Sequence, residues 1–218
     1  MVDYLFQDCL TSASGTVDAG SPGPVSGWTF DAPFTGGDPD VVFGSNKMTF
    51  NTYGATEYPI VNKDLPANLV SVDDVSGRWD FTEYVATPNF ETTYQLGVNN
   101  EDTSEMILVS LFGDGFVVLQ FGPIHASHFY YGGWSPAGSG SHQVYFHTGA
   151  GSNPPTLYLD GNEVELTYFD DVDTFAESFP DNCIFLGGGA AVGTTELSEV
   201  DNVFLMEGNP GHSTSLSC

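Results

Sequence analysis

The chain has 218 residues, 40% of them hydrophobic and 14% aromatic, which is enough apolar material for a sizeable core. It carries 29 acidic residues against three basic ones, for a formal net charge of −26. A surface this acidic repels the phosphates of nucleic acids and of anionic membranes, so we expect neither as a partner. The longest apolar run, 106–112, is far too short to span a bilayer.

The acidity also bears on the surroundings in which the protein works. Self-repulsion at this charge costs stability in dilute buffer, and salt or bound divalent cations reduce that cost. Two habitats stay open: a saline or calcium-containing medium, and no special habitat. Residues 1–10, MVDYLFQDCL, lack the basic stretch of a secretory signal. If the chain works outside the cell, we therefore expect either that a signal was removed or that the chain leaves by another route, such as lysis.

Short apolar or alternating runs, separated by Gly, Pro, Asn and Asp, follow one another along the chain and predict β-strands. A first strand over 2–9 is followed by a long loop over 11–27. The strongest hairpin joins 106–112 to 116–122, and its nearly continuous apolar arms predict burial on both faces. Residues 123–140 are expected to form a long, aromatic and glycine-rich loop. Residues 57–63 contain Pro59 and are expected to form an edge strand or a loop. Further strands are expected at 28–30, 41–44, 47–53, 77–86, 90–98, 144–147, 156–160, 163–169, 183–189 and 197–207.

About thirteen strands without a substantial helix favour an antiparallel two-sheet β-sandwich, a jelly roll, over one open sheet. No linker interrupts the pattern, so we expect one domain over 1–207 and a polar tail over 208–218. The three cysteines form neither a disulfide framework nor a zinc motif. Cys9 and Cys183 either pair or, more commonly for such residues, remain two buried thiols. Cys218 is expected to be exposed, as a free thiol or an intermolecular link.

Three of these strands follow one another within 141–168, with Asp160-Gly161-Asn162 as a tight-turn signal between the last two. The polar residues of this stretch are interpreted as the solvated outer face of the sandwich, away from the core. They are His142, His147, Asp160, Glu163 and Glu165.

Four segments of the second half follow one another in a characteristic order. They are His142-Gln143-Val144 at the start of a strand, LYLDGN over 157–162, LGGG over 186–189 and VDNVFL over 200–205. In this order the chain resembles the concanavalin A-like, or laminin G-like, jelly-roll superfamily. Residues 5–17 followed by Trp28 look like the opening strand and long loop of such domains. The superfamily includes lectins, carbohydrate-binding modules, glycoside hydrolases, polysaccharide lyases and structural virion domains, so the resemblance implies a fold and leaves the activity open.

We expect no catalysis. Retaining glycosidases need two carboxylates about 5–5.5 Å apart, and the resemblance implies a Glu-x-Asp-x-x-Glu strand for the family 16 hydrolases. Glu196, Glu199 and Asp201 of ELSEVDNV do not reproduce that order, and Glu163 with Glu165 lack a third acid. The basic companions typical of polysaccharide lyases are also missing, because the chain has one Arg. These acids are assigned to the solvated face.

A structural Ca²⁺ is the one cofactor that we predict. Calcium takes about six to eight oxygen ligands, and the resemblance implies an ion shared between Asp201 and an acid of the first strand, Asp3 or Asp8. A second candidate is the acidic connection with Asp170, Asp171 and Asp173. The alternative is that Asp201 caps a turn through its own backbone.

The aromatic loop upstream of 141 is the candidate ligand site. Sugars stack their apolar faces on exposed aromatic rings, helped by a few polar groups. His128, Tyr130, Tyr131 and Trp134 are the predicted glycan-binding residues. The alternative is that Phe129, Tyr130 and Trp134 cover an open end of the sandwich. His125 and His128 have no third ligand at a suitable spacing, so zinc is not expected.

These observations predict a non-enzymatic structural or interaction protein of a virus particle, such as a phage head-decoration, fibre or tail-associated jelly roll. It would lie on the virion surface, contact capsid or tail proteins and copies of itself as a homo-oligomer, and optionally bind surface glycans. The alternative is a secreted, extracellular bacterial carbohydrate-binding module or lectin.

Overall fold

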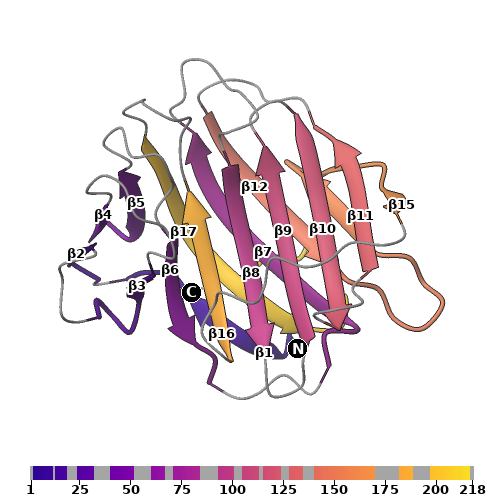
Figure 1. The fold of residues 1–218 in the computed structure, drawn as a ribbon, viewed down its shortest axis with the longest axis horizontal. Helices are drawn as coiled ribbons and strands as arrows, with labels where there is room; N and C mark the ends of the chain where they lie inside the picture. Colours follow the sequence, from indigo (N-terminus) through magenta and orange to yellow (C-terminus); the bar gives the residue numbers. More distant parts are fainter. Residues whose placement is uncertain are drawn as a thin grey trace.

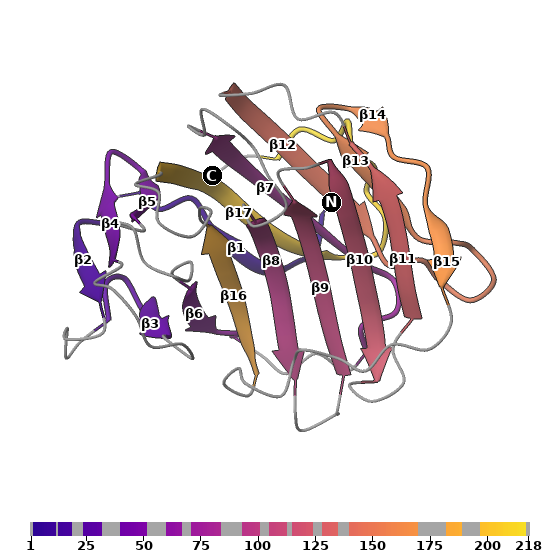
Figure 2. The ribbon, with the colours of Figure 1, turned by 45° about the horizontal axis from the view of Figure 1, so that its top comes forward.

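The computed structural model describes residues 2–11, 13–18, 24–31, 40–51, 60–66, 71–83, 93–100, 105–112, 115–123, 128–134, 140–169, 182–188 and 197–216. The regular elements of these residues are β-strands, arranged in two antiparallel sheets that face one another (Figures 1 and 2). The predicted all-β, two-sheet sandwich is confirmed. No helix within the described ranges is long and apolar enough to cross a membrane.

The nine-stranded sheet has β7 and β17 at its centre. β1 also pairs with β17, but it is not part of the linear order of the other eight strands. Its strands, in spatial order, are β14 (Asn162–Glu163), β13 (Thr156–Leu159), β12 (Gly140–His147), β7 (Val75–Glu83), β17 (Leu197–Glu207), β5 (Lys47–Asn51), β4 (Asp40–Gly44) and β2 (Gly15–Asp18), with β1 (Tyr4–Asp8) added. β2 lies within the segment 11–27 that was predicted to be a loop.

The eight-stranded sheet lies in front of the nine-stranded sheet in Figure 1. Its strands, in order, are β15 (Thr167–Phe169), β11 (His128–Gly133), β10 (Phe116–Pro123), β9 (Glu105–Phe112), β8 (Thr93–Asn100), β16 (Cys183–Gly188), β6 (Ile60–Asp64) and β3 (Thr29–Asp31). The predicted hairpin is β9–β10, and six consecutive residues of each strand are buried. The prediction that both faces of this hairpin are covered is therefore confirmed.

One hydrophobic core fills the space between the sheets, with Trp28, Trp79, Phe50, Phe81 and Phe146 fully buried in it. Each sheet makes room for a large ring by pairing it with a glycine across neighbouring strands. Phe146 lies opposite Gly77 and Phe185 lies opposite Gly97. A Cβ atom on Gly77 would lie 2.2 Å from the Phe146 ring, and one on Gly97 would lie 2.0 Å from the Phe185 ring. Only glycine fits beneath these rings.

The stretch 141–168 does not lie in a single sheet. β12, β13 and β14 belong to the nine-stranded sheet, whereas β15 pairs with β11 of the opposite sheet. The chain therefore crosses from one sheet to the other within 164–166, and Val164 is buried at this crossing. Glu163 and Glu165 are exposed as predicted, but they do not share one strand.

The interpretation of His142 and His147 as solvated residues was wrong. His142 alternates in phase with Val144 and Phe146, so its ring lies on the core side of β12, 6% exposed, against Phe81 and Trp134. Its Nδ1 lies 2.8 Å from the Asp160 carboxylate. His147 is on the outer face but is only 5% exposed.

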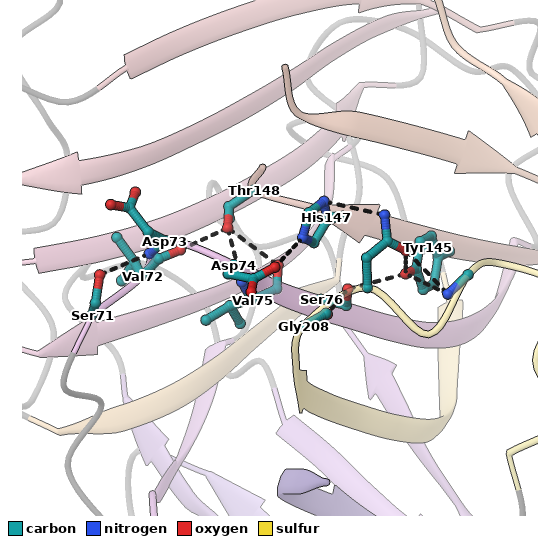
Figure 3. Close-up of polar contacts among 12 residues, drawn as sticks. Ser71, Val72, Asp73, Asp74, Val75, Ser76, Tyr145, His147, Thr148 and Gly208 are labelled. Atoms are coloured by element: carbon teal, nitrogen blue, oxygen red, sulfur yellow. Dashed lines mark hydrogen bonds and ion pairs between the residues drawn. The ribbon is translucent and has the colours of Figure 1, made fainter. Parts of the chain in front are cut away.

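The segment after β17 covers His147. It packs over β7 and β12 through a network of polar contacts (Figure 3). The Ser76 hydroxyl donates to the carbonyl of Gly208 at 2.6 Å, and the Tyr145 hydroxyl donates to Asn209 at 2.7 Å. The amide NH₂ of Asn209 lies 3.3 Å from Nδ1 of His147, and Nε2 lies 3.0 Å from Asp74. With Nδ1 accepting from Asn209, the proton of a neutral ring is on Nε2, directed at Asp74. Structural partners thus occupy both ring nitrogens.

A small apolar cluster beneath the same segment contains Cys9, Tyr145, Phe204 and Met206, with Leu216 packed against it. Cys9 is disulfide-bonded, whereas Cys183 is a buried thiol outside any disulfide. The expectation that both are buried thiols was therefore wrong for Cys9, and the two do not pair with each other. Cys218, the third cysteine of the chain, lies outside the described residues.

Candidate functional site

The aromatic segment predicted to be a loop contains the strand β11, which lies between β10 and the edge strand β15. Its residues alternate between the two faces of the sheet. Tyr130 pairs with the core residue Leu119, whereas Tyr131 pairs with Val118, which is not part of the main core. The predicted glycan-binding residues are therefore divided between the two faces.

The outer face of this edge carries a row of rings, which we call the aromatic strip. Phe116 and Tyr131 stack with their centroids 5.9 Å apart and their planes at 24°. Phe169 meets Tyr131 edge-on at 6.5 Å and Phe129 at 6.2 Å. Phe112 contacts Phe116 from the neighbouring strand at 6.0 Å. Phe169 is 52% exposed, so the strip reaches solvent at the sheet edge.

A hollow of about 580 Å³ opens beside the aromatic strip. It is lined by Phe116, Tyr131, Gly132, Gly133, Glu165 and Thr167. Two stacked rings, a floor without side chains, a carboxylate and a hydroxyl meet there. This combination offers an apolar platform with a few directional hydrogen-bonding groups, which is how sugar rings are held.

The shape of this hollow depends on Gly132. A Cβ atom at Gly132 would lie 2.6 Å from the carbonyl oxygen of Glu165 and 2.8 Å from a methyl of Val164. The backbone at the crossing 164–166 can approach β11 only because this side chain is missing. Gly132 thereby fixes where Glu165 stands relative to the aromatic strip.

Replacing Gly132 by alanine is expected to lower the free energy of unfolding by about 1–3 kcal/mol, because the crossing must move away from β11. Gly133→Ala is the matched control, since its Cβ would meet only the carbonyl oxygen of Gly115 at 3.7 Å. We expect that variant to stay within about 0.5 kcal/mol of the wild type. Chemical denaturation of the three proteins measures the difference, and equal stabilities for the two variants would contradict this account of the crossing.

The four predicted ligand residues have different environments. Tyr131 lines the hollow, and Tyr130 lies on the opposite face, stacked on Phe121 with a ring-plane angle of 4°. Burial, and then the neighbouring Tyr168, raise the pKa of Tyr130. His128 is exposed beside Phe121 and Tyr168.

Trp134 was predicted as a stacking platform, and the structure places it in the core instead. It is 8% exposed, and its indole N–H donates to the carbonyl of Phe112 at 2.9 Å. Trp134 is therefore a residue of the main core.

A second, polar hollow of about 420 Å³ lies on the outer face of the nine-stranded sheet. Its lining residues are Lys47, Asp80, Phe81, Thr82, Ser141, His142, Gln143, Asp160, Glu199 and Asp201. Asp80 accepts hydrogen bonds from Gln143 at 3.0 Å and from Asn202 at 3.1 Å. Lys47 and Glu199 form an ion pair at 2.5 Å.

Asp201, which lines this polar hollow, has a raised pKa. Burial raises its pKa, and Asp80, directly opposite on β7, adds to the rise, while the backbone of Asn202 and the charge of Lys47 oppose it. A raised pKa in the folded state means that the contribution of Asp201 to stability falls as the pH rises through that pKa. Chemically, the site is a set of hydrogen-bonding carboxylates and amides.

The structure does not bring Asp201 together with Asp8, one of the two first-strand acids proposed to share a calcium ion with it. Asp8 pairs with the core residue Val203, so it faces the inner side of the sheet, whereas Asp201 lines the hollow on the outer face. The Asp8 carboxylate accepts from Leu10 N, Trp28 Nε1 and Lys63 Nζ at 2.7–2.9 Å. Asp3 is exposed.

Within the described ranges, no group of three or more His, Cys, Asp or Glu side chains has an arrangement that could hold a metal. Asp170, Asp171, Asp173 and His125 lie outside those ranges. Calcium binding elsewhere in the chain stays a prediction.

Sequence reasoning missed Phe116, Phe129, Phe169, Glu165 and Thr167 at this edge. The run HFYYGG was assigned to a loop because of its glycines, although aromatic residues such as these are common in β-strands. Its pairing partner, β15, lies about forty positions further along the chain, with Tyr130 opposite Tyr168. A local pattern does not show which distant strand covers an edge, so the strip was not predictable as a unit.

No protein-family model matches the chain, and no curated protein matches it in sequence. Solved structures do match in fold. A carbohydrate esterase of the Shiga toxin-encoding bacteriophage phi24B aligns with a TM-score of 0.58 at 13% identity, over 96% of this chain and 100% of that one. The endo-β-1,3(4)-glucanase SCLam, of family GH16, aligns with 0.57 at 9% identity, over 95% and 91%.

The CBM2 module of the evolved Dit protein of Lactobacillus casei BL23 phage J-1 aligns with a TM-score of 0.55 at 6% identity, over 96% of this chain and 98% of that one. At these identities the likeness extends to the fold alone. The chain thus has a jelly-roll β-sandwich fold found in carbohydrate-binding modules, a family 16 glucanase and phage proteins.

Proposed function

We propose that the protein is a non-catalytic, glycan-binding jelly roll of a phage particle, and that the hollow beside the aromatic strip holds the sugar. The observation that carries the proposal is the stacked pair Phe116 and Tyr131 beside Glu165 and Thr167. The rings offer an apolar surface for one face of a pyranose, and a carboxylate and a hydroxyl can accept its hydroxyl protons. Two phage proteins of the same fold support the phage context.

Tyr131→Ala is expected to weaken glycan binding about tenfold or more, because a lost ring–sugar stack removes on the order of 1.5 kcal/mol. The test is a glycan array, followed by titration calorimetry on the strongest hit. Tyr4→Ala is the matched control, because Tyr4 is 38% exposed on β1 of the other sheet. An unchanged affinity in Tyr131→Ala, or an equal loss in Tyr4→Ala, would exclude this hollow as the binding site.

The alternative is a secreted carbohydrate-binding module, and the disulfide at Cys9 favours it because disulfides persist in oxidising compartments. Glycan binding is common to both proposals. Mass spectrometry of purified phage particles separates them: the first expects this chain among the particle proteins, and the second expects it only in the medium.

A further inference from the structure

Every lysine and arginine of this protein lies within ion-pair distance of a carboxylate. The sequence contains three Lys and Arg residues in total, and all three lie in the described part of the chain. Lys47 pairs with Glu199 at 2.5 Å, Lys63 with Asp8 at 2.7 Å, and Arg78 with Asp80 at 3.8 Å. A carboxylate, sulfate or phosphate on a ligand would have to displace one of these partners to gain a cationic contact.

None of these cations stands at the hollow beside the aromatic strip. Lys47, Lys63 and Arg78 lie on β5, β6 and β7, and none of them lines it. Among the described residues that line it, the charged one is Glu165, which is exposed. An acidic sugar stacked on Tyr131 would therefore meet a like charge at close range, together with the field of a chain with a formal charge of −26.

We propose that the hollow selects sugars by charge: it takes uncharged and amine-bearing sugars, rejects uronic and sulfated ones, and Glu165 is the residue that sets this preference. The inference rests on the proposed glycan binding and names the class of ligand. Glu165 contributes through direct contact, because charges further than about 8 Å away are largely screened at physiological salt. A sugar hydroxyl meets the Glu165 carboxylate as a neutral donor, whereas a protonated amine meets it as a charged donor, so the hydrogen bond gains the attraction of an ion pair.

The test uses three β-1,4-linked hexasaccharides that differ in one substituent: glucose, glucosamine and glucuronic acid hexamers. Calorimetry at physiological salt and mildly acid pH keeps the amine charged. For the wild type we expect the glucosamine hexamer to bind about tenfold more tightly than the glucose hexamer. The glucuronic acid hexamer is expected to bind at least about tenfold more weakly than the glucose hexamer.

Glu165→Gln is expected to reduce the advantage of the glucosamine hexamer to about twofold, since only the screened field of the remaining charges is left. The matched control is Glu163→Gln, which removes the same charge from an exposed residue that does not line the hollow. This control should keep the full preference. Both side chains are exposed, so both variants should melt like the wild type.

The possible results separate the role of Glu165, the charge selection and glycan binding itself. If Glu165→Gln keeps the tenfold preference, or Glu163→Gln loses it equally, Glu165 does not set the selectivity. If the glucuronic acid hexamer binds as tightly as the glucose hexamer, the charge selection is overturned while glycan binding stands. If none of the three hexamers binds and the array is also empty, the proposed function falls, and the inference falls with it.

Discussion

Gly77→Ala is expected to lower the free energy of unfolding by about 3 kcal/mol, a large part of the stability of a typical domain. The added methyl would lie 2.2 Å and 2.4 Å from two carbons of the Phe146 ring. That ring is 0% exposed and contacts Trp79 edge-on at 6.5 Å, so it has no free space to enter. Either β7 and β12 separate or the ring leaves its rotamer, and both changes disturb the centre of the core.

Urea denaturation of the variant measures this loss, and Gly44→Ala is the control. A Cβ at Gly44 meets no atom within 4 Å. That variant should match the wild type or gain a few tenths of a kcal/mol by restricting the unfolded chain. A double variant, Gly77→Ala with Phe146→Leu, should lose less than the sum of the two single variants, because the smaller side chain makes room for the methyl. Strict additivity would show that the two residues are not in contact.

Reduction of the disulfide at Cys9 is expected to lower the free energy of unfolding by about 2–4 kcal/mol, because the cross-link restricts the unfolded chain. Cys9→Ser should reproduce this loss without reductant and should no longer respond to it. Thermal melts with and without dithiothreitol measure both effects.

The matched control for this experiment is Cys183→Ala, since Cys183 is fully buried and outside any disulfide. It should lower the baseline stability through lost packing and yet keep the full response to reductant. A wild-type melt that does not change with reductant would show that the disulfide at Cys9 does not stabilise the fold.

Much of the fold follows from local patterns. The hairpin β9–β10 was predictable because both of its arms are apolar and only three residues separate them in sequence, so pairing and burial are specified together. His142 was also within reach, since it shares the phase of Val144 and Phe146 on one strand. Its assignment to the solvated face followed residue polarity instead of the alternation of β12.

The remaining features depend on contacts between distant parts of the chain. His147 is on the outer face, as its phase requires, but the segment after β17 covers it, and nothing near residue 147 indicates that. The candidate site is a similar case. Tyr131 was named from its residue type, whereas Glu165 and Thr167 reach it only because the chain changes sheets at 164–166. Register between strands far apart in sequence is not encoded locally.

The positions of Lys47, Lys63 and Arg78 within strands have a consequence for proteolysis. Trypsin cuts only after lysine or arginine, and these three residues all lie within strands: β5, β6 and β7. A protease needs an extended, unpaired segment, so each cut first requires the opening of a strand within a sheet. β7 lies between β12 and β17, and β6 lies between β16 and β3. Tryptic cleavage of this protein therefore reports the opening of its sheets, with no background from exposed loop sites.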